Sequence, residues 1–133
     1  MVGAVWVISV LLFGCQVVER APEREWNPLP IESFASVAGN WAGVLVRTPK
    51  ARRDDWVRLT IANDGEYVFE SFRTIGVFSG RGHLSLTEGK LTVSSDRGSA
   101  TGSWFASDGA RMLLFVGMMK DGTVYTAELE PAK

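Results

Sequence analysis

The sequence has little of the chemistry from which small enzymes and metalloproteins are built. Its 133 residues include one cysteine and one histidine, which excludes an internal disulfide framework and argues against a Cys/His metal site. Its 14 basic and 15 acidic residues lack the basic excess of nucleic-acid binders. No Gly-x-Ser-x-Gly, His-Glu-x-x-His or phosphate-cradling glycine motif occurs. We therefore expect a non-enzymatic protein without cofactor, metal or nucleic-acid partner.

A long hydrophobic run is also missing. Residues 1–13 are free of charged side chains, but they are fewer than the ~20 residues that a transmembrane helix needs. A run of this length is typical of a secretory signal peptide. The alternative is an ordinary apolar segment that ends in a buried, inert cysteine.

The run leads into Leu12-Phe13-Gly14-Cys15, which resembles the lipobox of bacterial lipoproteins. The resemblance implies that residues 1–14 are a signal peptide and that Cys15 is lipidated, so that the protein is anchored to a membrane of the bacterial cell envelope. In that family, Gln16 after the cysteine is typical of sorting to the outer membrane. In a diderm bacterium the protein would then face the periplasm.

Residues 15–36 are expected to be the lipidated cysteine and a polar tether. Prolines 22, 28 and 30 fix the backbone and remove hydrogen-bond donors, so this segment should be extended and largely unpaired. Trp26 is expected to dock on the following domain rather than at the lipid interface. One short helical turn is expected within Ile31 to Val37.

Residues 37–133 consist of short apolar runs separated by turn signals such as Asp-Gly. No segment has the pattern of a long helix. We expect an all-β fold, a single antiparallel up-and-down meander of about eight strands that closes into a small barrel. Glycines 76, 80 and 82 predict a bend in one strand. The expected strands lie near residues 41–47, 56–62, 66–73, 76–86, 89–95, 99–106, 111–118 and 123–129.

Alternation of apolar and polar residues predicts which side chains face the barrel interior. His83 is expected to face outward. Met112 to Met119 is apolar on both faces, so it is either covered by residues 16–36 or part of a contact surface. The expected inward residues include Val57, Leu59, Ile61, Leu84, Leu86, Leu91, Val93, Trp104, Tyr125, Ala127 and Leu129.

Gly39-Asn40-Trp41, at the start of the first expected strand, is similar to the signature of lipocalins. The resemblance implies an eight-stranded barrel that carries small apolar ligands. It also implies that Trp41 plugs the closed end of the barrel.

The segment 47–56 combines Arg47, Lys50, Arg52 and Arg53 with Asp54 and Asp55. In lipocalin-like barrels this loop is the lid over the open end. It is a gate for an anionic amphiphile, a contact for acidic lipid headgroups or a partner, or a solvated loop whose charges partly neutralise one another.

Three functions stay open. The first is binding or carriage of a small hydrophobic or amphiphilic ligand. This function requires a cavity of roughly several hundred Å³, and the barrel has no such cavity if its own aromatic side chains fill the interior. The second is an envelope interaction or inhibitor module that uses the barrel exterior and an envelope protein partner. The third, ranked last, is an enzyme with a buried carboxylate such as Glu70. The candidate ligand-binding residues are Leu59, Ile61, Phe69, Trp104, Tyr125, Arg52 and Arg53.

Overall fold

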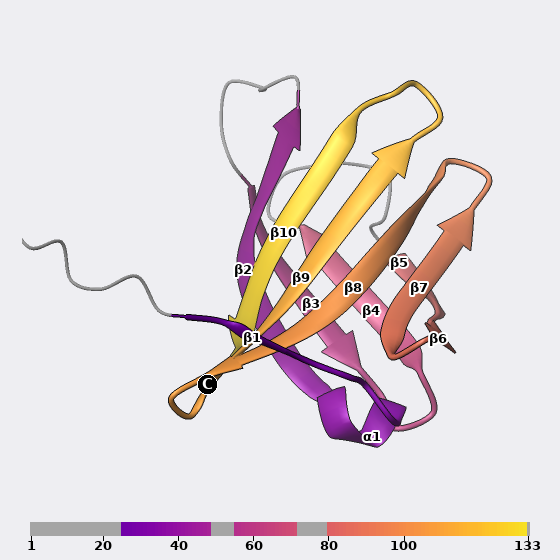
Figure 1. Ribbon diagram of the computed structural model, residues 1–133. Coiled ribbons are helices and arrows are strands. Elements are labelled where there is room, and N and C mark those ends of the chain that lie inside the picture. Colours follow the sequence, from indigo (N-terminus) through magenta and orange to yellow (C-terminus); the bar gives the residue numbers. More distant parts are fainter. Residues whose placement is uncertain (1–24, 49–54, 72–79, 133) are drawn as a thin grey trace, which may run out of the picture.

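The computed structural model describes residues 25–48, 55–71 and 80–132. These residues form an antiparallel 10-stranded sheet that curls into a small, nearly closed all-β barrel, as expected (Figure 1). The strands are β1 (Asn27–Leu29), β2 (Gly39–Thr48), β3 (Asp55–Ile61), β4 (Glu66–Ser71), β5 (Gly80–His83), β6 (Ser85–Thr87), β7 (Lys90–Ser95), β8 (Gly98–Ser107), β9 (Ala110–Met119) and β10 (Val124–Pro131), and the helix α1 spans Phe34–Val37.

The sheet follows the chain as an up-and-down meander, and β10 pairs with β2 to join the last strand to the first long one. The other side closes through a bend: β5 pairs with β4, β6 pairs with β7, and only Leu84 separates the two. The N–H of Leu84 donates to the carbonyl of Gly65, with an N···O distance of 2.8 Å. In the described part of the expected strand 76–86, the bend lies at Leu84 and divides the strand into two, and residues 76–79 lie outside the described residues.

Two of the hairpins, β6–β7 and β8–β9, have two-residue turns at positions that the sequence predicts. Glu88 and Gly89 have φ of 51° and 76°, and Asp108 and Gly109 have φ of 43° and 82°. Positive φ at both central residues is the geometry of a primed turn, which matches the right-handed twist of the two strands. These turns keep the successive strands antiparallel and adjacent.

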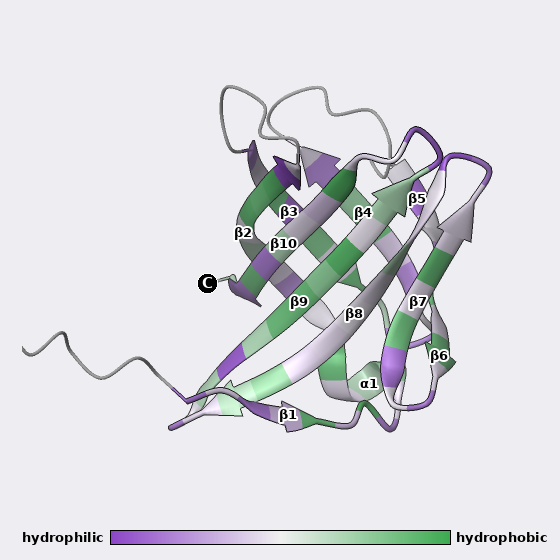
Figure 2. Cartoon of the chain, turned by 45° about the horizontal axis from the view of Figure 1, so that its top comes forward, coloured by the Kyte–Doolittle hydropathy of each residue, from purple (hydrophilic) through white to green (hydrophobic). Residues whose placement is uncertain are grey.

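The alternation of β3 places Val57, Leu59 and Ile61 in the core, each at most 4% exposed. Figure 2 shows the corresponding alternation of hydrophobic and hydrophilic residues along the strands. Helix α1 lies at one end of the barrel, which we call the closed end (Figure 1). There Trp41 is 5% exposed, and its Nε1–H donates to the carbonyl of Val37 at 2.8 Å.

Strand β1 corrects the expectation of an unpaired tether up to Ser36. Asn27, Pro28 and Leu29 pair with Ala106, Phe105 and Trp104 of β8. Proline is tolerated there because β1 is an edge strand with a single partner. Beyond it, the N–H of Ile31 donates to the carbonyl of Gly89 at 2.9 Å, and Ile31 is buried. The barrel thus includes residues N-terminal to 37.

The burial of two further residues, Trp26 and His83, agrees with the expectations from the sequence. Trp26 is partly buried, His83 is exposed, and the ring of His83 stacks on Phe34 with centroids 6.2 Å apart. Among the described residues, no helix is long and apolar enough to span a bilayer.

Candidate functional site

An apolar cavity lies inside the barrel. Its volume is about 50 Å³. Three of the predicted ligand-binding residues, Leu59, Phe69 and Tyr125, line it. The remaining lining residues are Leu45, Tyr67, Leu84, Val93, Ala100, Phe115, Gly117, Ala127 and Leu129.

The cavity exists because neighbouring strands place small residues inward at the same height. Ala100 of β8 pairs with Gly117 of β9, and Gly117 pairs with Tyr125 of β10. Ala127, the next inward residue of β10, is 3% exposed. Close packing fills most of the interior, but these three small residues leave a void among the larger side chains.

The other predicted ligand-binding residues do not meet at the cavity. Ile61 is 2% exposed and belongs to the core, but it does not line the void. Arg52 and Arg53 lie outside the described residues, as do Lys50 and Asp54. The inward prediction for Trp104 holds only in part, because its side chain packs against the core and also borders an outer cleft.

This outer cleft has a volume of about 280 Å³ and lies where β1 runs beside β7 and β8. Pro28, Pro30 and Trp104 contribute to its wall. The guanidinium carbon of Arg111 lies 5.3 Å from the centroid of the Trp104 ring, a cation–π distance. The Nε1–H of Trp104 is buried without a hydrogen-bond partner in the described structure. Strand β1, absent from the sequence prediction, is what forms this cleft.

Asp55, which the sequence predicts in a charged loop, is a buried polar residue. It is the first residue of β3 and is 1% exposed, and its carboxylate accepts a hydrogen bond from the hydroxyl of Ser71 on β4. Asp55 faces inward because it continues the alternation of Val57, Leu59 and Ile61 by one step. Extending that period backwards would have identified it. Glu70, the carboxylate that the enzyme hypothesis expected to be buried, is exposed.

Tyr67 contributes a phenol to the cavity wall, and burial raises its pKa above the ordinary value of 10.0 because the charged form loses hydration. The hydroxyl therefore stays neutral at physiological pH. The lining is apolar apart from the two tyrosines, Tyr67 and Tyr125, and it contains no carboxylate or imidazole, so the site is suited to binding rather than to acid–base chemistry.

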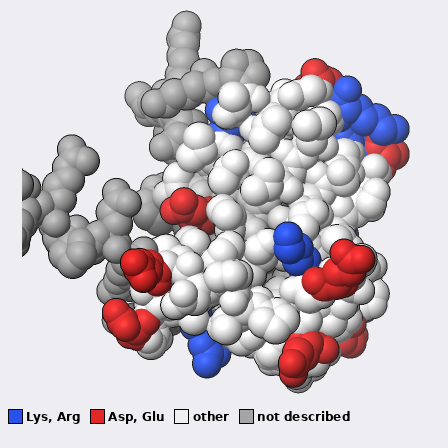
Figure 3. Space-filling model, in the orientation of Figure 1, with Lys and Arg blue, Asp and Glu red and all other residues white. Residues whose placement is uncertain are grey.

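The second candidate site is the outer face of β2, β10 and β9, which we call the outer face. Val46, Val116 and Met118 are 37%, 47% and 58% exposed. In register, Val46 and Val116 both pair with Thr126, so these residues form a continuous surface across three strands. Most of the face over these strands carries no charge in Figure 3. Residues 25–36, the described part of the segment that was expected to cover Met112–Met119, leave Val116 and Met118 exposed, and residues 16–24 lie outside the described residues.

Comparisons with protein-family models, curated proteins and solved structures found no match for this chain.

Proposed function

We propose that the protein is a lipid-anchored lipoprotein of the bacterial cell envelope whose barrel binds a small hydrophobic or amphiphilic ligand in its interior. The observation that carries the ligand proposal is the apolar cavity lined by Leu59, Phe69 and Tyr125. The anchor rests on the resemblance of Leu12 to Cys15 to a lipobox. The similarity of Gly39-Asn40-Trp41 to the lipocalin signature adds support.

The size of the cavity narrows the ligand class. A space of about 50 Å³ is well below the ~300–1,000 Å³ of sites for drug-sized molecules. Apolar cavities of about 150 Å³ stay dry and accept benzene, and the space inside this barrel is about 50 Å³. A single ring or a short alkyl tail therefore enters only when the lining side chains move apart.

Filling the cavity should abolish ligand binding. We expect benzene and 1-hexanol to raise the melting temperature of the full chain carrying Cys15→Ser, and to shift the methyl NMR signals of Leu45 and Leu59. Ala127→Leu places a larger side chain in the void and should remove both effects. Thr126→Leu is the matched control, because the neighbouring position on β10 faces outward.

Two results would contradict the proposal. One is the absence of shifts at inward methyl groups with either probe. The other is an equal response of Ala127→Leu and Thr126→Leu, which would place the ligand outside the barrel.

A second function, an envelope interaction or inhibitor module, is favoured by the outer face. Exposed apolar patches of more than a few hundred Å² are uncommon on monomeric proteins and mark contact sites. Here Val116 and Met118 remain exposed on adjacent positions of one strand face. This module uses different residues from the cavity, so the two functions can be tested separately.

A further inference from the structure

A row of four side chains crosses the outer face at one height. The register aligns Trp56 of β3 with Val44 of β2, Val44 with Glu128 of β10, and Glu128 with Leu114 of β9. Successive residues of a strand point to opposite faces. The neighbours Val57, Leu45, Leu129 and Leu113 are buried in the core, so all four members of the row point outward.

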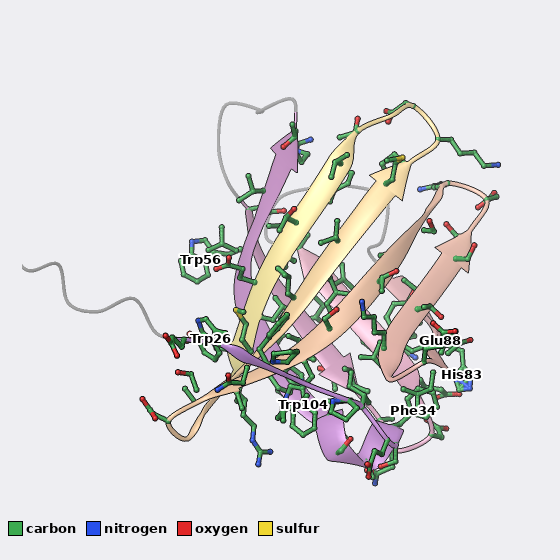
Figure 4. All side chains as sticks on the ribbon, in the orientation of Figure 1. Trp26, Phe34, Trp56, His83, Glu88 and Trp104 are labelled. Carbon is green, nitrogen blue, oxygen red and sulfur yellow. The ribbon has the colours of Figure 1, made fainter. Side chains whose placement is uncertain are left out.

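The row places an exposed aromatic ring and an acidic side chain on either side of a small apolar one. Trp56 is 62% exposed, the largest exposure among the described large hydrophobic residues. Its side chain stands away from the barrel beside β2 in Figure 4. Glu128 is exposed, and its carboxylate makes no hydrogen bond or ion pair with the part of the chain that the structure describes. Val44, between them, is only partly exposed.

The charges beside the row are few. The outward positions of β2 and β9 are uncharged from Asn40 to Thr48 and from Met112 to Met118, and those of β10 carry Glu128 and Glu130. On the adjoining strand β3, Arg58 is exposed and aligns through Ala42 with Glu130. Glu128 is therefore the carboxylate of this surface that has no cation aligned with it on the described strands.

We propose that the row Trp56–Val44–Glu128 binds an arginine or lysine side chain of a partner protein. Neighbouring strands are ~4.8 Å apart, so the backbones of Trp56 and Glu128 are about 10 Å apart. A guanidinium or ammonium group over Val44 can lie within ~6 Å of the indole ring and pair with the carboxylate at the same time. The exposed side chains of Val46, Val116 and Met118 provide apolar surface beside the bound cation.

The same charges favour a protein over other occupants of the face. Glu128 and Glu130 would be repelled by the anionic headgroups of an envelope membrane. A second copy presents the same two carboxylates, and the cation that it brings beside them, Arg58, is aligned with its own Glu130. This proposal names the kind of partner that the exterior interaction module binds, and it rests on that proposed function. It does not depend on the cavity.

Peptide titration of the full chain carrying Cys15→Ser tests the row. The probes are acetyl-Val-Arg-Val-amide and the same peptide with citrulline, the uncharged isostere of arginine. We expect the arginine peptide to shift the NMR signals of the Trp56 indole N–H and the Glu128 amide with millimolar Kd. The citrulline peptide should bind at least fivefold more weakly.

Substitutions then locate the binding. Trp56→Leu and Glu128→Gln should each raise the Kd of the arginine peptide by about three- to fivefold, because each removes one exposed interaction. Glu70→Gln is the matched control, since Glu70 is an exposed carboxylate on β4, and it should leave the Kd unchanged. The spectrum of each variant reports whether the barrel is folded.

Equal affinity for the arginine and citrulline peptides would overturn the proposal, as would an unchanged Kd for Glu128→Gln. If the arginine peptide gives no response, two other results would reassign the face. NMR shifts of the row residues on dilution would assign it to a second copy, and shifts on addition of phosphatidylethanolamine–phosphatidylglycerol vesicles would assign it to a bilayer. Failure of the proposed ligand binding would instead be seen as unchanged NMR signals of the inward methyl groups when benzene or 1-hexanol is added. The peptide does not reach those groups, so the two tests are independent.

Discussion

At the scale of single residues, Trp41 combines apolar burial with a satisfied polar atom. Its ring is 5% exposed at the closed end, and its Nε1–H bonds to the carbonyl of Val37, the last residue of α1. A buried indole N–H without a partner would cost part of the burial energy. The hydrogen bond also links α1 to β2, so one side chain fills the end of the barrel and holds the helix on it.

Truncating this side chain should be costly. We expect Trp41→Ala to lower the free energy of unfolding by ~3–5 kcal/mol, because it removes the ring and leaves a cavity. The comparison variant is Trp56→Ala, whose ring is mostly exposed and whose loss should cost less than ~1 kcal/mol. Urea unfolding of both variants measures the difference. Equal losses would show that Trp41 is not the plug of the closed end.

At the scale of elements, the pairing of β2 with β10 closes the meander, and it depends on one glycine. A Cβ on Gly43 would lie 1.8 Å from the backbone oxygen of Glu128. Atoms cannot approach this closely, and the neighbour is backbone rather than a flexible side chain. Gly43 therefore allows the two strands to lie as close as they do.

Gly43→Ala should push β2 away from β10. The expected cost is about 3 kcal/mol of unfolding free energy, at the upper end of overpacking effects. Amide exchange should rise first along Val44–Glu128 and the neighbouring pairs. Ala42→Ser, one position earlier on β2, serves as the control and should change stability by less than ~1 kcal/mol. Unaltered exchange between β2 and β10 in Gly43→Ala would argue against this close approach.

At the scale of the whole molecule, the proposed anchor and the barrel are separate parts of the chain. Nine residues lie between Cys15 and Glu25, where the described structure begins. Each buried methylene contributes ~0.8 kcal/mol, and stable attachment takes two or more acyl chains, which a lipoprotein modification supplies. Membrane attachment in this proposal comes from the lipid and not from the barrel.

Cys15→Ser should therefore release the protein from the membrane without unfolding the barrel. In a bacterial host, we expect the unchanged protein in the membrane fraction with a mass increase from its acyl chains. The variant should lack the added mass and lose its membrane attachment. Ser36→Ala is a control outside the lipobox that should remain lipidated. Retained attachment together with an unmodified mass in the unchanged protein would refute the anchor.

The alternation of apolar and polar residues located the long strands. It did not reveal strand β1, which forms the outer cleft, or the inward position of Asp55. Strand β1 has three residues, one of them Pro28, which is too few for alternation to be visible. Asp55 was grouped with Asp54 and the arginines before it because a run of charges is usually solvated. Its inward position is decided by the point at which β3 begins, which depends on pairing with β2 and β4.

Local properties of the chain determined the barrel: apolar alternation with period two set the faces of the strands, and glycine-containing turns set their antiparallel order. These properties act between neighbours and can be read along the chain. Only the tertiary structure decided what lies together across strands: the small residues Ala100, Gly117 and Ala127 around a cavity of about 50 Å³, and the row from Trp56 to Glu128. Such sets depend on register, which cooperative pairing of the whole sheet selects.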